Sequence, residues 1–364
     1  MELFTRTVLL LSVLHGMLVQ AAPCNPRSPH WKALAPIPLY PRQEHTTLAL
    51  NSTTLAILGG IIPITNSSPP LFTTTPLLQL YDIPTNKWHP APAAPAPIPI
   101  NHPNAVVVNS KLYLLGGLSD AGDGVWRGTN QSFVYDIRSN TWSALPPMPA
   151  SDVARGSAAM GVDEQTGVVY LAGGMTQLPL IEGAGVQESV AAVSAFDTRT
   201  NQWVSLGSLP RGVRRMPGRR DHAGAAVVQG VLYVLGGRDT GQTNVRGEVF
   251  ALNLRDLGKG WVTKKGVMPT PRGGVSAAAV GGKVYVFGGE GNPEEGSDGV
   301  FGQVEAYDTR TDSWERLGRM RAPRHGTSAV AVGRGVYIPG GGIRLGGAPV
   351  DTFDVFYPEA CEWL

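Results

Sequence analysis

The sequence predicts an all-β protein assembled from many short strands and tight turns. Its 364 residues include 46 glycines and 30 prolines, and 42% of the residues are apolar. This composition favours short strands and turns over long helices. Apolar runs that end in a Gly-Gly pair also recur along almost the whole chain. A regular repeat of this kind indicates equivalent structural units rather than unrelated domains.

The repeat has two parts, a Gly-Gly pair and a tryptophan that follows it 22 to 29 residues later. Successive pairs lie 52 to 63 residues apart, and a period near 50 is typical of a β-propeller in which each repeat forms one blade. The pattern therefore predicts six blades. The pairs end at Gly60, Gly117, Gly174, Gly237, Gly289 and Gly341, and the tryptophans are Trp88, Trp142, Trp203, Trp261, Trp314 and Trp363.

Each blade is expected to hold four strands, a to d. An apolar run such as LYVLGG, which ends at Gly237, suits a strand that is buried on both faces. The double glycine lets the backbone turn sharply and pass close to the next blade. Segment 80–88, LYDIPTNKW, predicts strand c and a turn whose Asp and Asn side chains bond the local backbone, and Trp88 is expected to pack between blades. The segment before Trp261 departs from this form and predicts a longer turn.

These features resemble the Kelch repeat, and the resemblance extends over nearly all of residues 23–364. It implies a single six-bladed Kelch β-propeller with strand a innermost. Segment 30–38, HWKALAPIP, is similar to the segments around the other tryptophans and places Trp31 at the usual position. The chain ends one residue after Trp363. We therefore expect the N-terminal strand to supply strand d of the last blade, which closes the ring and removes an exposed sheet edge.

Residues 1–22 have the pattern of a secretory signal peptide, with Arg6 before an apolar run and small residues at its end. The run is too short to span a bilayer. We therefore expect a protein without a membrane span that enters the secretory pathway and is secreted or held in a vesicle or vacuole lumen. In that oxidising compartment Cys24 and Cys361, which ring closure would bring together, are expected to form a disulfide. Three sequons predict glycosylation, at Asn51, Asn66 and Asn130.

The connections into strand a and the b–c loops are expected on one face of the propeller. Long loops on a rigid scaffold often carry function, and these loops hold aromatic residues outside the repeat pattern, namely Phe72, Trp126 and Phe301. We therefore predict a ligand site at this mouth of the central channel. The long b–c loops span residues 61–76, 118–131, 175–188 and 290–302.

The connections into strand a carry basic residues that should surround the channel mouth. Two interpretations remain open: the arginines bond carbonyls and acidic groups between blades, or several basic residues bind an oxygen-rich ligand. Segment 211–222, with five arginines, is expected to be a solvated loop. The basic residues are Arg42, His45, His102, Arg155, Arg219, Arg220, His222, Arg272, Arg324 and His325.

Several kinds of chemistry have no support in the sequence. The repeat accounts for the Gly-Gly pairs that end the apolar runs, no phosphate-binding loop is indicated, and neither a GxSxG elbow nor an HExxH motif occurs. Histidines do not cluster with carboxylates at metal-ligand spacing, so no metal or other cofactor is expected. The net charge of +2 gives no indication of nucleic-acid binding, and we expect a monomer.

Three classes of function remain open. The signal peptide, six blades, sequons, length and terminal cysteines together are similar to secreted fungal Kelch-like proteins of natural-product pathways, including hetero-Diels–Alderases of tropolonic sesquiterpene biosynthesis. That resemblance implies an enzyme, without metal or redox cofactor, that catalyses a stereoselective hetero-Diels–Alder cyclisation of a small organic substrate after loss of water forms a reactive heterodiene. One alternative is a sugar mutarotase, epimerase or carbohydrate-binding propeller, similar to the periplasmic sialic-acid mutarotases. The other is a non-catalytic extracellular protein-interaction propeller.

A cyclase of this type would gain most of its rate from positioning in an apolar pocket. Basic side chains would stabilise the developing oxyanion. The predicted catalytic residues are His325, Arg324, His222 and His45. The predicted substrate-binding residues are Trp126, Phe72, Arg155, Arg272, His102 and Phe301.

Overall fold

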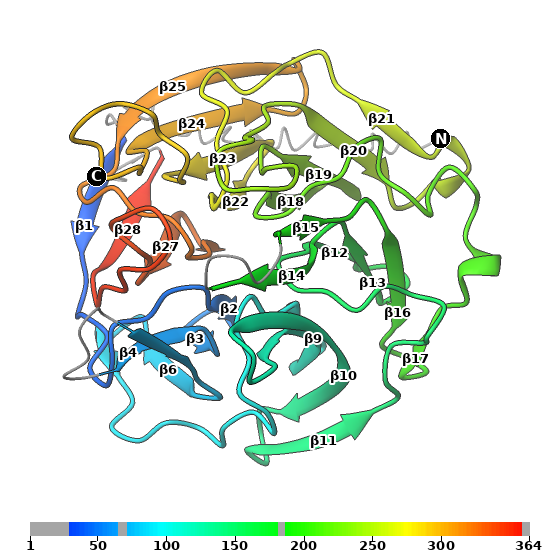
Figure 1. Ribbon diagram of the computed structural model, residues 1–364, viewed down its shortest axis with the longest axis horizontal. Coiled ribbons are helices and arrows are strands. Elements are labelled where there is room, and N and C mark those ends of the chain that lie inside the picture. The colour runs from blue at the N-terminus through cyan, green and yellow to red at the C-terminus, as the bar shows by residue number, and fades with distance from the viewer. Residues whose placement is uncertain (1–28, 65–70, 181–185, 359–364) are drawn as a thin grey trace, which may run out of the picture.

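Six antiparallel blades surround a central channel in the computed structural model, which describes residues 29–64, 71–180 and 186–358 (Figure 1). The all-β prediction is confirmed, since the helices in this part of the chain are two short 3₁₀ turns, η1 (Leu206–Ser208) and η2 (Leu257–Lys259). None of these helices is long and apolar enough to cross a membrane.

Blades 1 to 3 follow in chain order, each with strand a nearest the channel. Blade 1 holds β2 (Thr46–Ala49), β3 (Thr54–Leu58), β6 (Leu78–Asp82) and β7 (Lys87–Trp88). Blade 2 holds β8 (Ala105–Val108), β9 (Lys111–Asp120), β10 (Val125–Asp136) and β11 (Thr141–Leu145). Blade 3 holds β12 (Ala159–Asp163), β13 (Val168–Ala172), β16 (Val193–Asp197) and β17 (Gln202–Trp203).

Blades 4 to 6 complete the circle. Blade 4 holds β18 (Gly224–Val228), β19 (Val231–Leu235), β20 (Val249–Asn253) and β21 (Trp261–Thr263). Blade 5 holds β22 (Ser276–Val280), β23 (Lys283–Phe287), β24 (Gln303–Asp308) and β25 (Ser313–Arg319). Blade 6 holds β26 (Val330–Val332), β27 (Gly335–Pro339), β28 (Phe353–Tyr357) and the N-terminal β1 (His30–Ala33).

The N-terminal strand closes the ring, as predicted. Strand β1 pairs antiparallel with β28, with Trp31 opposite Phe356. The Nε1 of Trp31 donates to the carbonyl of Arg319 in the preceding blade at 3.2 Å. Strand a of each blade also contacts strand a of both neighbouring blades, so the innermost layer is continuous. The signal peptide, Cys24, Cys361, Trp363 and Asn66 lie outside the described residues.

Tryptophans and glycines join the blades as predicted. Each described repeat tryptophan donates its Nε1 hydrogen to a carbonyl of the preceding blade; Trp88, for example, reaches the oxygen of Ala35 at 2.9 Å. Gly289 donates its N–H to the carbonyl of Arg324 in the next blade at 3.1 Å. At Gly288, φ is +58° and a Cβ would lie well inside van der Waals contact with that same carbonyl. Only glycine tolerates both conditions.

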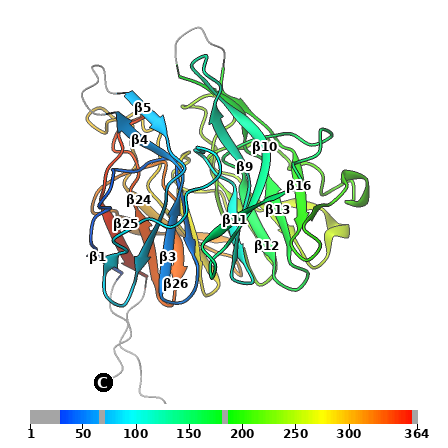
Figure 2. The same cartoon turned by 90° about the horizontal axis from the view of Figure 1, so that it is seen from below.

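The b–c connections of blades 1 to 3 contain more regular structure than the sequence suggested. Residues 118–131 were expected to form a loop, but β9 and β10 continue as a hairpin beyond the body of the blade. The N-terminal end of β10 also pairs with β14 (Met175–Pro179), which in turn pairs with β15 (Glu188–Ser189). Blade 1 adds a second hairpin of β4 (Ile61–Ile64) and β5 (Leu71–Thr74). Figure 2 shows both hairpins rising from the same face.

Candidate functional site

Six residues, one from each blade, form an inner ring around the channel. Each lies in the turn just before strand a and has a left-handed backbone, with φ between +47° and +63°. Five of the six donate their backbone N–H to the carbonyl of the ring residue in the preceding blade, such as His102 N–H to Glu44 O at 2.8 Å. The sixth, His222, donates its N–H to Ser157 Oγ at 3.1 Å. The inner ring comprises Glu44, His102, Ser157, His222, Gly274 and Gly326.

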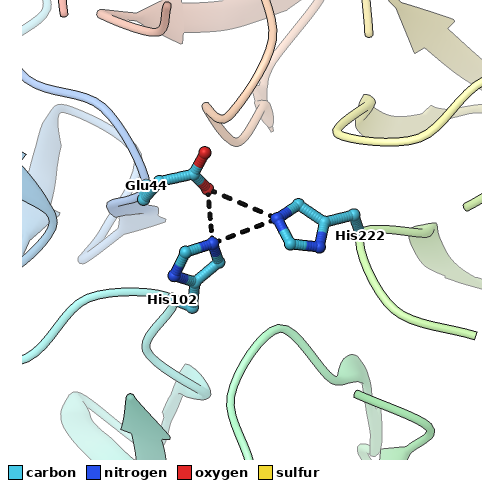
Figure 3. A group of neighbouring side chains, drawn as sticks. All are labelled: Glu44, His102 and His222. Carbon is cyan, nitrogen blue, oxygen red and sulfur yellow. Dashed lines mark hydrogen bonds and ion pairs between the residues drawn. The ribbon is translucent and has the colours of Figure 1, made fainter. Parts of the chain in front are cut away.

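This backbone conformation is uncommon for residues with side chains, and such residues cluster at functional sites. Three ring members carry long polar side chains, which point toward one another at the channel axis (Figure 3). The Nε2 of His102 lies 2.9 Å from Glu44 Oε2 and 3.0 Å from His222 Nε2. The Nε2 of His222 lies 3.8 Å from the same Glu44 oxygen. Small residues at the other three positions leave room beside this Glu-His-His cluster.

The far side of each imidazole is held by a residue one position earlier in the chain. The Nδ1 of His102 lies 2.6 Å from Asn101 Oδ1, and the Asn101 amide nitrogen donates to Thr74 Oγ1 at 2.8 Å. The Nδ1 of His222 lies 2.6 Å from Asp221 Oδ1. Because both partners are oxygen acceptors, each Nδ1 carries the hydrogen and each Nε2 points into the channel.

Charge and burial shift the ionisation of the cluster in opposite directions. Burial alone would raise the pKa of Glu44, but His102 and His222 beside its carboxylate hold that pKa well below its ordinary value. Burial, and then the Arg238 guanidinium, lower the pKa of the His222 imidazole. Glu44 is therefore ionised near neutral pH, and His222 favours its uncharged form.

A buried ion-pair network supports the cluster from blades 4 to 6. The Nε of Arg238 donates to Asp221 Oδ1 at 3.0 Å, and its Nη1 pairs with Glu290. Burial alone would raise the pKa of the Glu290 carboxyl, but His325 and Arg238 lower it. The Nδ1 of His325 lies 3.3 Å from Glu290 Oε2, and its Nε2 lies 2.7 Å from the carbonyl of Arg344.

The cluster forms the floor of a cavity of about 320 Å³ at the channel mouth. Another part of the lining is apolar and includes Ile61, Phe72, Trp126 and Leu178 from blades 1 to 3 and their hairpins. The Trp126 ring lies 6.0 Å from the His102 ring, centroid to centroid. A substrate here would meet ionisable groups on one side and aromatic surface on the other.

Four of the ten predicted site residues line this cavity, namely His102, His222, Phe72 and Trp126. His325 does not line the cavity; its Nδ1 lies 3.3 Å from Glu290 Oε2, which does. His45 is directed elsewhere: its Nε2 is 3.5 Å from Thr327 Oγ1, and burial, reinforced by Arg42, lowers its pKa to about 3. Phe301 is buried and does not line the cavity.

The three predicted site arginines lie inside the blades instead of in the cavity, which corrects their expected position. Each side chain bonds carbonyls of its own strand b and a polar residue of strand c. Arg324, for example, donates to Gly340 O at 2.7 Å and Ile338 O at 2.9 Å, and its Nη1 forms an ion pair with Asp354 Oδ2 at 3.0 Å. These contacts match the structural interpretation left open by the sequence. The equivalent pairs are Arg42 with Gln79, Arg155 with Ser194, and Arg272 with Glu305.

Sequence reasoning missed Glu44, Asp221, Arg238 and Glu290. It also found no His–carboxylate cluster, because the three cluster residues are 58 and 120 residues apart and no local spacing links them. The available signal was the repeat register, since Glu44, His102 and His222 occupy the same position in their turns. Of the described sequon residues, Asn51 lies in the exposed β2–β3 turn and Asn130 is exposed on β10.

The comparisons with known proteins agree with this architecture. Residues 180–364 match the model of the KLHDC2/KLHL20/DRC7 Kelch-repeats domain, and residues 99–149 match the Kelch motif. Kelch-like protein terF of Aspergillus terreus is 34% identical over 97% of this chain and 74% of its own length. Kelch-like protein 25 of Xenopus tropicalis is 27% identical over 78% of this chain, and beta-scruin of Limulus polyphemus is 25% identical over 80%.

The chain spans about three quarters of terF but only 44% of the Xenopus protein and 30% of beta-scruin. The likeness to the animal proteins therefore covers less than half of each of them, whereas the likeness to the fungal protein includes nearly the whole of this chain. Together with the six blades and their repeat residues, these matches show that the chain belongs to the Kelch-repeat family.

Proposed function

We propose that this protein is a small-molecule enzyme of natural-product biosynthesis that catalyses a stereoselective hetero-Diels–Alder cyclisation. One observation carries the proposal: a single cavity combines the buried Glu-His-His cluster with the aromatic wall of Phe72 and Trp126. The cluster suits the polar end of a heterodiene, and the wall suits an apolar alkene partner. Similarity to a fungal Kelch-like protein along 97% of the chain supports the same choice.

The geometry supports formation of the heterodiene by loss of water. Glu44, held ionised, can accept the proton of an acidic hydroxyl on the precursor. An imidazolium at His102 can give its Nε2 proton to the departing hydroxide, which leaves as water. The proton on Glu44 then returns to His102 Nε2, which lies 2.9 Å from Glu44 Oε2. Such positioned acid–base groups typically contribute 10²- to 10⁴-fold in rate.

The cyclisation itself depends more on positioning of the two reactants than on acid–base or nucleophilic catalysis. Holding the heterodiene against the cluster and the alkene against Trp126 would expose one face of the diene to its partner. Effective molarities for well-oriented reactants reach about 10⁵ M or more, which is enough to outcompete the uncatalysed, non-selective reaction in water. The apolar wall favours this substrate over a sugar, since sugar hydroxyls would lose hydrogen bonds to water there.

The proposal is tested by incubating the purified protein with a hydroxybenzyl-type heterodiene precursor and an apolar cyclic alkene. We expect product enriched in one stereoisomer, formed faster than without protein. The Trp126→Ala variant should lose stereoselectivity, and Glu44→Gln should slow heterodiene formation. Substitution of the exposed His89, which is remote from the cavity lining, should change neither. Racemic product at the background rate with the folded wild type would overturn the proposal.

A further inference from the structure

We propose that Glu44, His102 and His222 form a binding site for one divalent transition-metal cation. All three side chains are buried, and one potential ligand atom of each lies within 4.8 Å of the others. The proposal concerns the same cavity as the proposed function, but it does not depend on that function because metal binding is measured without substrate.

The separations between the ligand atoms match those around a metal. For metal–ligand bonds of about 2.1 Å, adjacent ligands lie about 3.0 Å apart in octahedral geometry and about 3.4 Å apart in tetrahedral geometry. The observed separations are 2.9, 3.0 and 3.8 Å. Two imidazoles and one carboxylate on one face of a cation, with open positions opposite, are the ligand set of many divalent iron sites.

The hydrogen-bond inventory leaves a place for a cation. Asn101 and Asp221 accept the Nδ1 hydrogens of His102 and His222, so each uncharged ring presents an Nε2 lone pair. These two lone pairs face each other at 3.0 Å, and the Glu44 carboxylate adds a third acceptor. Arg238 Nη2 also lies 3.1 Å from both ring nitrogens of His222, which places it over the face of the ring and not in the ring plane between the three ligand atoms. Three acceptors pointing at one another are unfavourable unless a proton or a metal ion lies between them.

The surrounding charge also favours a cation. Near the cluster lie three buried carboxylates, Glu44, Asp221 and Glu290, and one buried guanidinium, Arg238. With uncharged histidines this group has a formal charge of −2. Buried charge is costly unless it is compensated. A divalent cation would provide that compensation at the centre of the cluster.

The partners of the imidazoles resemble those that orient metal-binding histidines. Such rings usually donate their second N–H to a carboxylate or carbonyl, which fixes the ring and raises its basicity. Asp221 does this for His222 and Asn101 for His102. The free side of the cation would face the cavity, where it could hold a substrate oxygen as a Lewis acid. Imidazole ligands favour zinc, iron or cobalt over magnesium or calcium.

The test titrates Co²⁺ and Zn²⁺ into the full-length protein after dialysis against a chelator, with isothermal titration calorimetry and thermal denaturation as readouts. We expect one site per chain with micromolar or tighter affinity and a higher melting temperature at saturation. Cobalt should also give visible absorption bands of an imidazole complex. Glu44→Gln, His102→Gln and His222→Gln should each abolish this site, and the exposed His89→Gln should keep it.

Positioning is tested with Asp221→Asn, which leaves all three ligands in place and should weaken binding by 10- to 100-fold. Circular dichroism of the metal-free variants checks folding, and Glu44→Gln is isosteric, so at least this ligand variant is expected to retain the fold. Absence of binding at millimolar metal, or equal binding by wild type and folded Glu44→Gln, would refute the site. If the metal site is refuted but the metal-free protein still cyclises its substrate selectively, the proposed function is retained.

Discussion

Replacing Arg324 should destabilise the propeller without acting on the cavity. Its guanidinium is buried, donates to the carbonyls of Gly340 and Ile338 and pairs with Asp354, whose side chain is only 2% exposed. Arg324→Met keeps much of the side-chain volume but removes all of these partners. Breaking a buried pair from one side typically costs about 3–5 kcal/mol, because the other charge stays buried.

The same carboxylate provides a matched control. Arg321 Nη1 lies 3.0 Å from Asp354 Oδ1, but the Arg321 side chain is 49% exposed. Exposed ion pairs contribute about 0–1 kcal/mol, so Arg321→Met should change the free energy of unfolding little. The double variant Arg324→Met with Asp354→Leu should be more stable than Arg324→Met alone, since it leaves no unpaired buried carboxylate.

Guanidinium chloride denaturation followed by tryptophan fluorescence measures all four proteins. We expect Arg324→Met to lose at least about 3 kcal/mol relative to Arg321→Met, while metal binding and cyclisation per folded molecule stay near wild type. Equal stability of the two single variants would contradict the buried ion-pair argument. Loss of activity in a fully stable Arg324→Met protein would instead return Arg324 to the role of a catalytic residue.

Three further predictions concern other contacts of the fold. Gly288→Ala should lower the melting temperature far more than Gly281→Ala in thermal scans, because both positions have φ near +60° but only Gly288 faces a carbonyl, that of Arg324, while Gly281 faces open space. Trp31→Ala should cost about 3–5 kcal/mol in denaturant titrations, and a loss below about 1 kcal/mol would mean that β1 contributes little to ring closure. The pKa of the Asp221 carboxyl is depressed, with burial opposed by His222 and Arg238; its ionised form therefore stabilises the fold above the ordinary Asp pKa of about 3.9. The difference in free energy of unfolding between wild type and Asp221→Asn should thus shrink as the pH falls below about 4. A difference that does not depend on pH would contradict the stabilising role of the Asp221 carboxylate.

The fold could be predicted because every blade repeats the same local solution. Each blade needs a glycine at the position equivalent to Gly288, because a carbonyl of the next blade comes close to it there. In the same way, Trp31 repeats the contact that Trp88 makes with the preceding blade. Six copies of such a requirement are visible in one sequence. The extended hairpin of β9 and β10 was not predicted, because it occurs in one blade and the repeat pattern therefore gives no signal for it.

The site was harder to predict because one position along the chain decides where a side chain points. His45 and His325 lie in turns equivalent to those of His102 and His222, but one position later and one position earlier than the inner ring. His45 therefore faces Thr327 Oγ1 instead of the cavity, and His325 faces the Glu290 carboxylate. Glu44 does reach the channel axis, but it is acidic, and the sequence prediction for these turns named only basic residues.

A symmetric scaffold becomes an asymmetric site through substitutions at equivalent positions. The residue after each Gly-Gly pair forms a β-bridge with the residue before the inner ring. In blades 1 to 3 this residue is apolar and packs in or beside the Trp126 cluster, whereas in blades 4 and 5 it is charged and joins the buried network. In blade 6 it is glycine. The six residues are Ile61, Leu118, Met175, Arg238, Glu290 and Gly342.

This division explains why the cavity has one apolar and one charged side, and it separates two requirements of the proposed reaction. Changing Met175 or Leu118 should alter the shape of the wall and therefore the stereochemistry of the product. Changing Arg238 should alter the charge around the cluster and therefore metal affinity or proton transfer. Because the two sets belong to different blades and share no hydrogen bond among the described contacts, their effects should be nearly additive. Strong coupling between them would mean that the cavity acts as a single unit and that its two sides cannot be assigned separate roles.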